Sequence, residues 1–196
     1  MRRFAFTTKD GRSGVVRPAR RRDAKDCLAI VWEATHERPR TLMTSPEEFW
    51  SPRQWRKHRH GWDPDGVTLV AEVVGRVVAN LGCERGRRPR ERHLCEFGVT
   101  VARRYRGMGV GTALLEALEA WAREAGVEKI MLRAFDTNTR ARSLYERLGY
   151  TTEGIERLAV KFPDEYIDTV RMGKFVGGPA APARADTGRS ARKRRH

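Results

Sequence analysis

The chain has 196 residues, enough for one domain whose hydrophobic core needs no metal ion or disulfide. Its 40 Lys and Arg residues outnumber 25 Asp and Glu residues, and the formal net charge of +15 predicts an acidic partner: a phosphorylated cofactor, nucleic acid, a ribosomal surface or an anionic membrane. Cys27, Cys83 and Cys95 lack CxxC spacing, which argues against a disulfide framework or a zinc site, and no apolar run approaches the roughly 18 residues of a membrane-spanning helix. Because the basic start MRRF continues into polar residues rather than a signal-peptide core, we expect a cytoplasmic protein without a membrane partner.

The first half of the chain predicts two helices and four strands before the glycine-rich turn. "GVVRPARRRDAKDCLAIVWEATHE" from Gly14 predicts a short strand, a turn and a helix whose apolar residues recur three and four positions apart. "SPEEFWSPRQWRKHRHGW" predicts a second short helix with Ser45 as its N-cap. "GVTLVAEVVGRVVANLGCER" predicts a β-hairpin around Gly75, and "HLCEFGVTV" predicts the strand that follows it.

The second half alternates helices and strands. A helix with Leu114, Leu118 and Trp121 on one side ends at Gly126, and "VEKIMLRAF" predicts a strand. "NTRARSLYERLGY" predicts a capped helix ending at Gly149. "LAVKF" and "YIDTVRM" predict two strands around a turn at residues 163–164. The predicted order is β, α, α, β, β, β, α, β, α, β, β.

The stretch "RRYRGMGVGTALLEALEAWA" joins a strand to a helix through a glycine-rich turn. Such a turn favours phosphate, because the amides of the first helical turn are unpaired and the helix dipole attracts negative charge. The Walker pattern fails because no GK[ST] follows, and the dinucleotide pattern GxGxxG fails at Thr112. The pattern R/Q-x-x-G-x-G/A does fit, with Arg106, Gly109 and Gly111.

With "EFGVTV", this turn, "KIMLRAF" and "NTRARSLYERLGYTTEG" in this order, residues 14–175 resemble the GNAT superfamily of N-acetyltransferases. The resemblance implies a single α/β domain with a mixed, mostly antiparallel twisted sheet and helices on both faces. It implies acetyl-CoA as co-substrate and no metal, with the pantetheine arm between the splayed fourth and fifth strands and the pyrophosphate on the turn. The cofactor-binding residues that it implies are Val99, Thr100, Val101, Arg106, Gly107, Met108, Gly109, Val110, Gly111, Thr112 and Asn138.

The resemblance also implies catalytic roles for two residues. Tyr145 stands where the family has the acid that protonates the departing thiolate, and a phenol of pKa about 10 stays protonated beside a thiol of about 8.5. Glu96 precedes the cofactor-pairing residues, where many members place a glutamate that deprotonates the amine through water; Asp136 is the reserve candidate. The alternatives are structural: Tyr145 in the core, Glu96 paired with an arginine, and Asn138 as a helix N-cap.

Three further groups of residues could have either a functional or a purely structural role. His58 and His60 with Asp63 or Asp65 match no established metal-ligand spacing, and a solvated basic loop is expected. Five large side chains stand in the segment that often walls the family's acceptor pocket, although core packing explains them equally well: Met43, Phe49, Trp50, Trp55 and Trp62. Five arginines in a hairpin turn are expected to be solvated, with contact to RNA or to an acidic substrate as the alternative: Arg85, Arg87, Arg88, Arg90 and Arg92.

The expected activity is transfer of acetyl from acetyl-CoA to a primary amine, on an amino acid, a small amine or a protein N-terminus or lysine, by direct attack in a ternary complex. The alternative is a nucleic-acid- or ribosome-associated binding protein that uses the same scaffold. We expect an N-terminal extension at residues 1–13, an acetyltransferase domain at 14–176, and a disordered basic tail at 177–196 that gives weak nucleic-acid contact. A monomer or a homodimer is expected.

Overall fold

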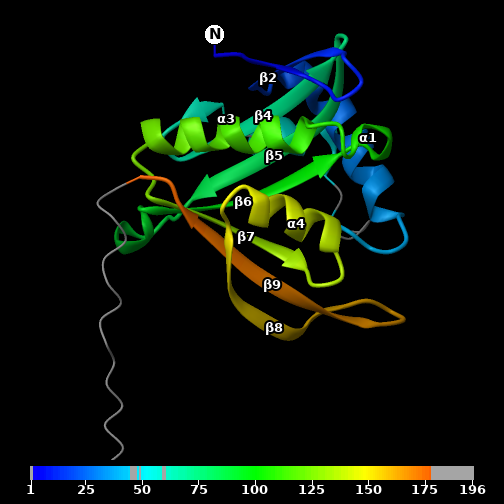
Figure 1. The fold of residues 1–196 in the computed structure, drawn as a ribbon, viewed down its shortest axis with the longest axis vertical. Coiled ribbons are helices and arrows are strands. Elements are labelled where there is room, and N and C mark those ends of the chain that lie inside the picture. The colour runs from blue at the N-terminus through cyan, green and yellow to red at the C-terminus, as the bar shows by residue number, and fades with distance from the viewer. Residues whose placement is uncertain (1, 45–47, 49, 59–60, 178–196) are drawn as a thin grey trace, which may run out of the picture.

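The fold is built on one open, twisted sheet (Figure 1). The computed structural model describes residues 2–44, 48, 50–58 and 61–177. Among these residues, nine strands form the sheet in the order β1-β2-β4-β5-β6-β7-β9-β8, with β3 beside β4, and β6–β7 is the parallel pair. The strands are β1 (Phe4–Thr7), β2 (Ser13–Pro18), β3 (Trp62–Asp63), β4 (Gly66–Val73), β5 (Arg76–Arg85), β6 (Leu94–Val101), β7 (Lys129–Phe135), β8 (Thr151–Lys161) and β9 (Tyr166–Phe175). The α-helices are α1 (Ala24–Thr35), α2 (Pro52–His58), α3 (Val110–Glu124) and α4 (Thr139–Arg147).

Helices cover both faces of the sheet. α3 and α4 lie on the near face in Figure 1, and α3 packs on β4, β5 and β6. On β4, Leu69 and Ala71 join the hydrophobic cluster of α3, whereas Val70 joins the cluster of Cys27 and Leu28 from α1. Successive residues of a strand point to opposite faces, so α1 and α3 lie on opposite sides of β4. The predicted fold class is therefore confirmed.

A buried ion cluster holds the start of α1 to the sheet. Arg17 on β2 is 1% exposed, and its guanidinium donates to both carboxylate oxygens of Asp23, at 2.7 and 3.0 Å, and to Glu72 on β4, at 2.5 Å. The hydrogen bond from Arg17 also lowers the pKa of Glu72. Because a buried charge without its partner is costly, this cluster fixes where α1 begins relative to β2 and β4.

The structure corrects the predicted order of elements at three places. The order lacked β1, which lies within the expected extension at residues 1–13 and pairs with β2, and it lacked the two-residue β3. β8 begins at Thr151, seven residues before the predicted strand, because pairing with β9 extends it. The predicted N-cap Ser45 lies outside the described residues. The described helix α2 instead follows Ser51, whose hydroxyl accepts from the Gln54 N–H at 3.3 Å, while the Gln54 side chain accepts from the Ser51 N–H at 2.8 Å.

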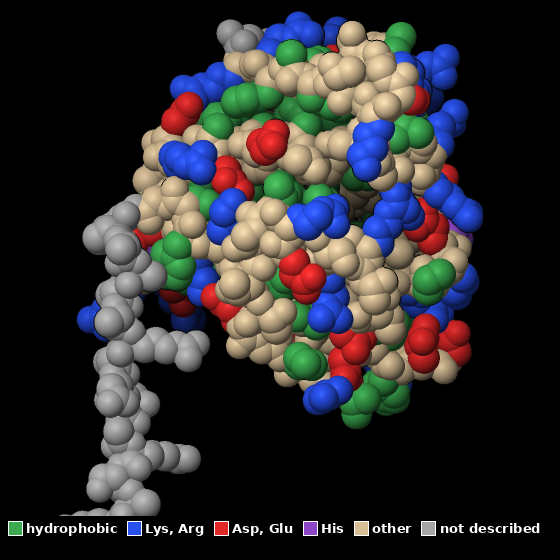
Figure 2. Space-filling view, in the orientation of Figure 1, with side chains coloured by type: hydrophobic (Ala, Val, Ile, Leu, Met, Phe, Trp, Pro, Cys, Tyr) green, Lys and Arg blue, Asp and Glu red, His purple; other side chains and the backbone are tan. Residues whose placement is uncertain are grey.

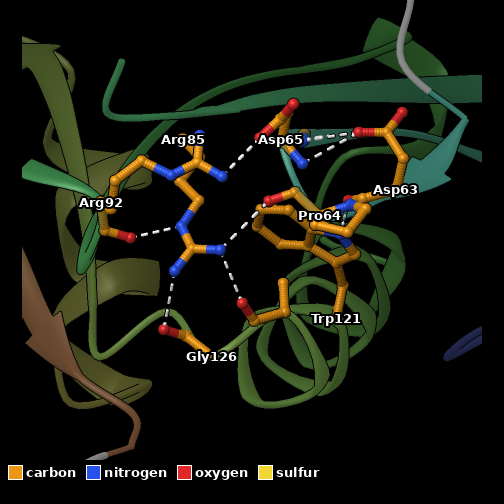
Figure 3. Close-up of polar contacts among 9 residues, drawn as sticks. Asp63, Pro64, Asp65, Arg85, Arg92, Trp121 and Gly126 are labelled. Carbon is orange, nitrogen blue, oxygen red and sulfur yellow. Dashed lines mark hydrogen bonds and ion pairs between the residues drawn. The ribbon is translucent and has the colours of Figure 1, made fainter. Parts of the chain in front are cut away.

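The arginine hairpin divides into structural and exposed residues. Arg85 donates from its guanidinium to the carbonyls of Ala125 at 2.7 Å and Gly126 at 3.1 Å, at the C-terminus of α3, and to that of Pro64 at 3.3 Å; its Nε donates to the Arg92 carbonyl (Figure 3). These bonds satisfy carbonyl groups that the end of a helix leaves without partners. The expectation that all five arginines are solvated is therefore wrong for Arg85, which locks β5 to α3.

Arg92 is also engaged, through an ion pair of 2.6 Å with Asp65, whereas Arg87 and Arg88 have side chains 90% and 83% exposed. On the face seen in Figure 2, Lys and Arg side chains alternate with Asp and Glu rather than forming one basic patch. The remaining exposed arginines form a smaller positive surface than the sequence cluster suggested.

The described residues supply neither a metal centre nor a helix long and apolar enough to cross a membrane. Of the weak histidine motif, His60 and the side chain of His58 lie outside the described residues. The Asp63 carboxylate accepts the N–H groups of Asp65 and Gly66, both at 3.0 Å, so it shapes the turn into β4. The three cysteines are buried free thiols.

Candidate active site

A gap between β6 and β7 creates the site. The two strands pair only where Leu94, Cys95 and Glu96 face residues 129–131. Beyond Glu96, β6 continues to Val101 in register with β5 alone. The last five residues of β6 therefore leave one backbone edge unpaired by β7, as the splayed strands of the family implied.

A cavity of about 1000 Å³ opens at this gap, and Figure 2 shows a hollow rimmed by Lys and Arg side chains. That volume suits an extended organic ligand. Most of the site residues predicted from sequence line it: Glu96, Val99, Thr100, Val101, Arg106, Gly107, Gly109, Gly111, Thr112, Asn138 and Tyr145. Met108 and Val110 do not line it, because Val110 is buried in the hydrophobic core and the partly buried Met108 packs against that core.

The glycine turn presents a row of free backbone donors. Gly107 and Gly109 have φ of +79° and +89°, left-handed values at which a side chain is strained, and α3 begins directly after them at Val110. No described residue accepts a hydrogen bond from the backbone N–H of any residue from 107 to 112. Unpaired amides at the N-terminus of a 15-residue helix form an anion site that suits phosphate. Met108 and Val110 can take part through the backbone alone.

Arg106 is already paired. Its guanidinium binds the Glu37 carboxylate through two hydrogen bonds of 2.7 Å, and its Nε donates to the Val101 carbonyl at 2.8 Å. The expected cofactor-binding role of Arg106, through its positive charge, thus has a competitor in this bidentate pair. Through these contacts, Arg106 connects the end of β6 to the segment after α1.

Other cations at the cavity were missed in the sequence. Lys9, Arg140 and Arg147 line it, and none forms an ion pair with a described residue. A Cβ placed on Gly107 would stand 2.8 Å from Nη2 of Arg140, so this guanidinium lies over the glycine turn. The available signal was local: Arg140 stands in the first turn of α4, where the helix dipole disfavours a cation unless an anion is near.

Both residues predicted on α4 serve the fold as well as the cavity. Tyr145 is 7% exposed and packs edge-on against Phe97 and Tyr150, with ring centroids 5.9 and 6.0 Å away, and burial raises its pKa to about 12. Asn138 is the N-cap of α4, since its Oδ1 accepts from the Ala141 N–H at 3.2 Å. The structural alternatives are thus observed for both, yet the Tyr145 hydroxyl and the Asn138 side-chain NH₂ have no partner among the described residues.

Glu96 is exposed and lines the cavity, and it forms no ion pair with a described residue. Glu84 is its register partner on β5 and lines the same cavity, a second carboxylate that the sequence did not indicate. Cross-strand partners point to the same face, so the two carboxylates lie side by side. The reserve candidate Asp136 lies outside the cavity lining, with its backbone N–H bonded to the Asp168 carbonyl at 3.1 Å.

The segment after α1 closes the other end of the cavity. Arg40 forms ion pairs with Asp164, at 2.6 Å, and with Glu165 at the tip of the β8–β9 hairpin, and it lies 4.1 Å over the Phe162 ring. Arg133 on β7 shares the face of Glu96, because the register partner of Glu96 is two residues before it. Contacts of Arg133 are weak: 3.3 Å to Met43 Sδ and 3.5 Å to Glu156.

Of the five large side chains expected near an acceptor pocket, Met43 lines the cavity. Trp55 is 9% exposed and belongs to the core under α1, and Trp62 stacks on Phe4 with ring centroids 5.9 Å apart. Trp50 is 43% exposed outside the cavity lining, and Phe49 lies outside the described residues. Core packing therefore accounts for the tryptophans at 55 and 62.

Solved acetyltransferases share this fold. The chain superposes on a GNAT-superfamily phosphinothricin acetyltransferase from Sinorhizobium meliloti in complex with AcCoA, with a TM-score of 0.73, 19% identity, and coverage of 93% of this chain and 98% of that one. It also superposes on a ribosomal-protein-alanine N-acetyltransferase from Brucella melitensis, with a TM-score of 0.72, 27% identity, and coverage of 82% and 98%.

Sequence relationships agree. Residues 30–150 match the Acetyltransferase (GNAT) family, and the chain is 30% identical over 150 residues to the L-amino acid N-acetyltransferase AaaT of Escherichia coli (strain K12), covering 71% of this chain and 91% of that protein. The chain belongs to the GNAT acetyltransferase family, and it is an acyltransferase.

Proposed function

We propose that this enzyme transfers acetyl from acetyl-CoA to the primary amine of a small amino acid by direct attack in a ternary complex. The observation that carries the proposal is one continuous cavity that joins the free amides of the glycine turn to Glu96 and Tyr145 at the strand gap. The donor class follows from these amides, which suit a pyrophosphate, and from the unpaired edge of β6, which suits the amide groups of a pantetheine arm.

The residues of the gap divide the proton transfers between them. Glu96 accepts a proton from the amine, directly or through water, so that the neutral nitrogen forms the new C–N bond at the thioester carbonyl carbon. A free N–H of β6 donates to the carbonyl oxygen as negative charge gathers there. Tyr145 gives its proton to the sulfur as the C–S bond breaks. The acceptor ammonium loses two protons in all: Glu96 takes the first and passes it to solvent, and the second leaves the nitrogen after the C–N bond forms and restores the Tyr145 hydroxyl. One proton thus reaches the thiol and one reaches solvent.

Burial suits Tyr145 to this part. Its pKa of about 12 keeps the hydroxyl protonated at neutral pH. The same apolar surroundings raise the pKa of a thiol leaving group, because burial disfavours any anion that lacks a cationic partner. The proton therefore moves from the Tyr145 phenol to a thiolate, and burial in the site raises the pKa of both groups.

The proposed class of acceptor amine rests on the position of Arg133 and on the name of one relative. The guanidinium of Arg133 lies at the cavity on the face of Glu96, and the hydrogen bond from Arg133 to Glu156 is long, at 3.5 Å. A guanidinium prefers a carboxylate that it can bind with two hydrogen bonds, and an α-carboxylate bound there brings the neighbouring amine toward Glu96. The Escherichia coli relative acts on L-amino acids by its name.

A panel of amines tests this proposal by thiol release from acetyl-CoA. Each amino acid is compared with the amine that lacks its carboxylate, in the wild type and in Arg133→Met. We expect the wild type to prefer the amino acid over the amine that lacks the carboxylate. In Arg133→Met the KM of the amino acid should rise about tenfold or more, while the KM of the decarboxylated amine changes little. Equal use of both amines by the wild type contradicts the acceptor class, and no thiol release with any amine contradicts the activity.

The nucleic-acid alternative is not favoured. In the arginine hairpin on which this alternative relied, Arg85 and Arg92 make internal contacts. Of the expected basic tail at residues 177–196, residues 178–196 lie outside the described residues.

A further inference from the structure

The turn between β1 and β2 packs against the glycine turn. The backbone N–H of Lys9 donates to the Met108 carbonyl at 3.2 Å, and Nη2 of Arg12 lies 3.3 Å from the Met108 sulfur. A Cβ on Gly109 would stand 4.0 Å from the Thr7 carbonyl oxygen. Residues 7–12 therefore form a wall beside the free amides, although they precede the family match at residues 30–150.

This β1–β2 turn is held by its own hydrogen bonds. Thr8 is 3% exposed, and its N–H donates to the Arg12 carbonyl while its hydroxyl accepts from the Arg12 N–H, both at 2.9 Å. Gly11, with φ of +84°, donates to the Thr8 carbonyl at 2.9 Å. Asp10 and Arg12 neutralise each other in an ion pair of 2.7 Å. Lys9 is left as the cation of the turn without an acidic partner among the described residues.

Charge at this end of the cavity is unbalanced. Lys9 and Arg140 line it and have no carboxylate partner in the described part of the chain, whereas Arg106 is neutralised by Glu37. Both side chains are exposed, and two cations beside six free amides create a positive potential that attracts an anion from solvent. Coenzyme A carries such anions in its pyrophosphate and its 3′-phosphate.

We propose that Lys9 is a cofactor-binding residue whose ammonium group contacts a phosphate of coenzyme A. The β1–β2 turn then completes the phosphate site from a part of the chain that the sequence assigned to an extension. This inference rests on the proposed use of acetyl-CoA.

Lys9→Met tests it, because methionine keeps an unbranched stem and removes the charge. We expect the dissociation constant of acetyl-CoA, measured by calorimetry at low salt, to rise about three- to tenfold, and the difference from wild type to shrink as salt increases. Lys25→Met is the matched control, since Lys25 is exposed on α1 and lies outside the cavity lining; it should bind like the wild type. The melting temperature of each free variant checks that the fold is intact.

Truncated donors identify the contact. S-acetylpantetheine lacks both the pyrophosphate and the 3′-phosphate. With this donor, the ratio of kcat/KM between Lys9→Met and wild type should be close to one. With 3′-dephospho-acetyl-CoA, a persisting loss assigns Lys9 to the pyrophosphate and a vanished loss assigns it to the 3′-phosphate; both support the proposal.

Two results overturn it while the proposed function stands: an unchanged dissociation constant for acetyl-CoA in Lys9→Met, or an equal loss with S-acetylpantetheine, which marks a structural role. A wild type that binds no acetyl-CoA overturns the proposed function together with this inference.

Discussion

Tyr145 combines a buried ring with a hydroxyl that has no partner in the described part of the chain. Replacing it with phenylalanine keeps the edge-on contacts with Phe97 and Tyr150 and removes only the phenolic proton. We expect Tyr145→Phe to lower kcat about a hundredfold, with little change in acetyl-CoA binding. Steady-state kinetics and calorimetry check the two quantities separately; a wild-type kcat means that Tyr145 serves only the core.

The raised pKa of Tyr145 also predicts how the rate depends on pH. A phenol of pKa about 12 stays protonated as pH rises, so its ionisation removes no activity between pH 7 and 10 in the wild type. A basic limb in kcat within that range points to a different acid.

Glu96 is tested against its neighbour Glu84. The acceptor amine is mostly protonated at low pH, so loss of the base should matter most there. We expect Glu96→Gln to lower kcat/KM about tenfold to a hundredfold at the acidic end of the profile, and less at the basic end. Glu84→Gln is the matched variant, one strand away in the same cavity. A larger loss in Glu84→Gln than in Glu96→Gln identifies Glu84 on β5 as the base.

At the scale of elements, single side chains tie distant segments together. Arg40 joins the segment after α1 to the β8–β9 hairpin, Arg106 joins that segment to the end of β6, and Arg85 joins β5 to α3 (Figure 3). Two of these links border the cavity, so the walls of the site are fixed by arginines whose partners lie far away in sequence. Their charge explains part of the basic composition without a nucleic-acid partner.

The Arg85 link predicts a stability effect. Arg85→Met leaves the carbonyls of Ala125 and Gly126 without their donor, and we expect the free energy of unfolding to fall by about 2 kcal/mol. Arg87→Met, at a side chain that is 90% exposed, should change it by less than about 0.5 kcal/mol. Urea unfolding measures both, and equal effects of the two substitutions contradict the structural role.

For the whole molecule, binding at the cavity should be visible as thermal stabilisation. At a hundred times its dissociation constant, acetyl-CoA stabilises the native state by about 2.7 kcal/mol, which raises the Tm of a chain of this size by about 5–10 °C. Gly109→Val should remove that shift, because φ of +89° strains a branched residue and its side chain obstructs the free amides. Gly154→Val, in exposed β8 with open space around it, should keep the shift. A full shift in Gly109→Val contradicts the phosphate site.

The sequence by itself determined the order of most elements and the glycine turn. Helical and strand periodicities are local, as are the helix stops at Gly126 and Gly149, both with positive φ in the structure. The turn is equally local, because Gly107, Gly109 and the start of α3 are consecutive. These features need no knowledge of distant contacts, which is why the element order and the turn could be predicted from local patterns. The fold class and the gap between two strands were implied by the resemblance to the GNAT family that these segments carry.

Only the tertiary structure decided what the charged residues do. Lys9, Glu84, Arg133 and Arg140 reach one cavity from four segments, and an ion pair such as Glu37–Arg106 leaves no pattern in a single sequence. The same holds for β1, whose four residues become a strand by pairing with β2. Composition counts charges, but their partners are set by long-range packing, so the sequence could place the glycine turn and yet could not show which cations remain free beside it.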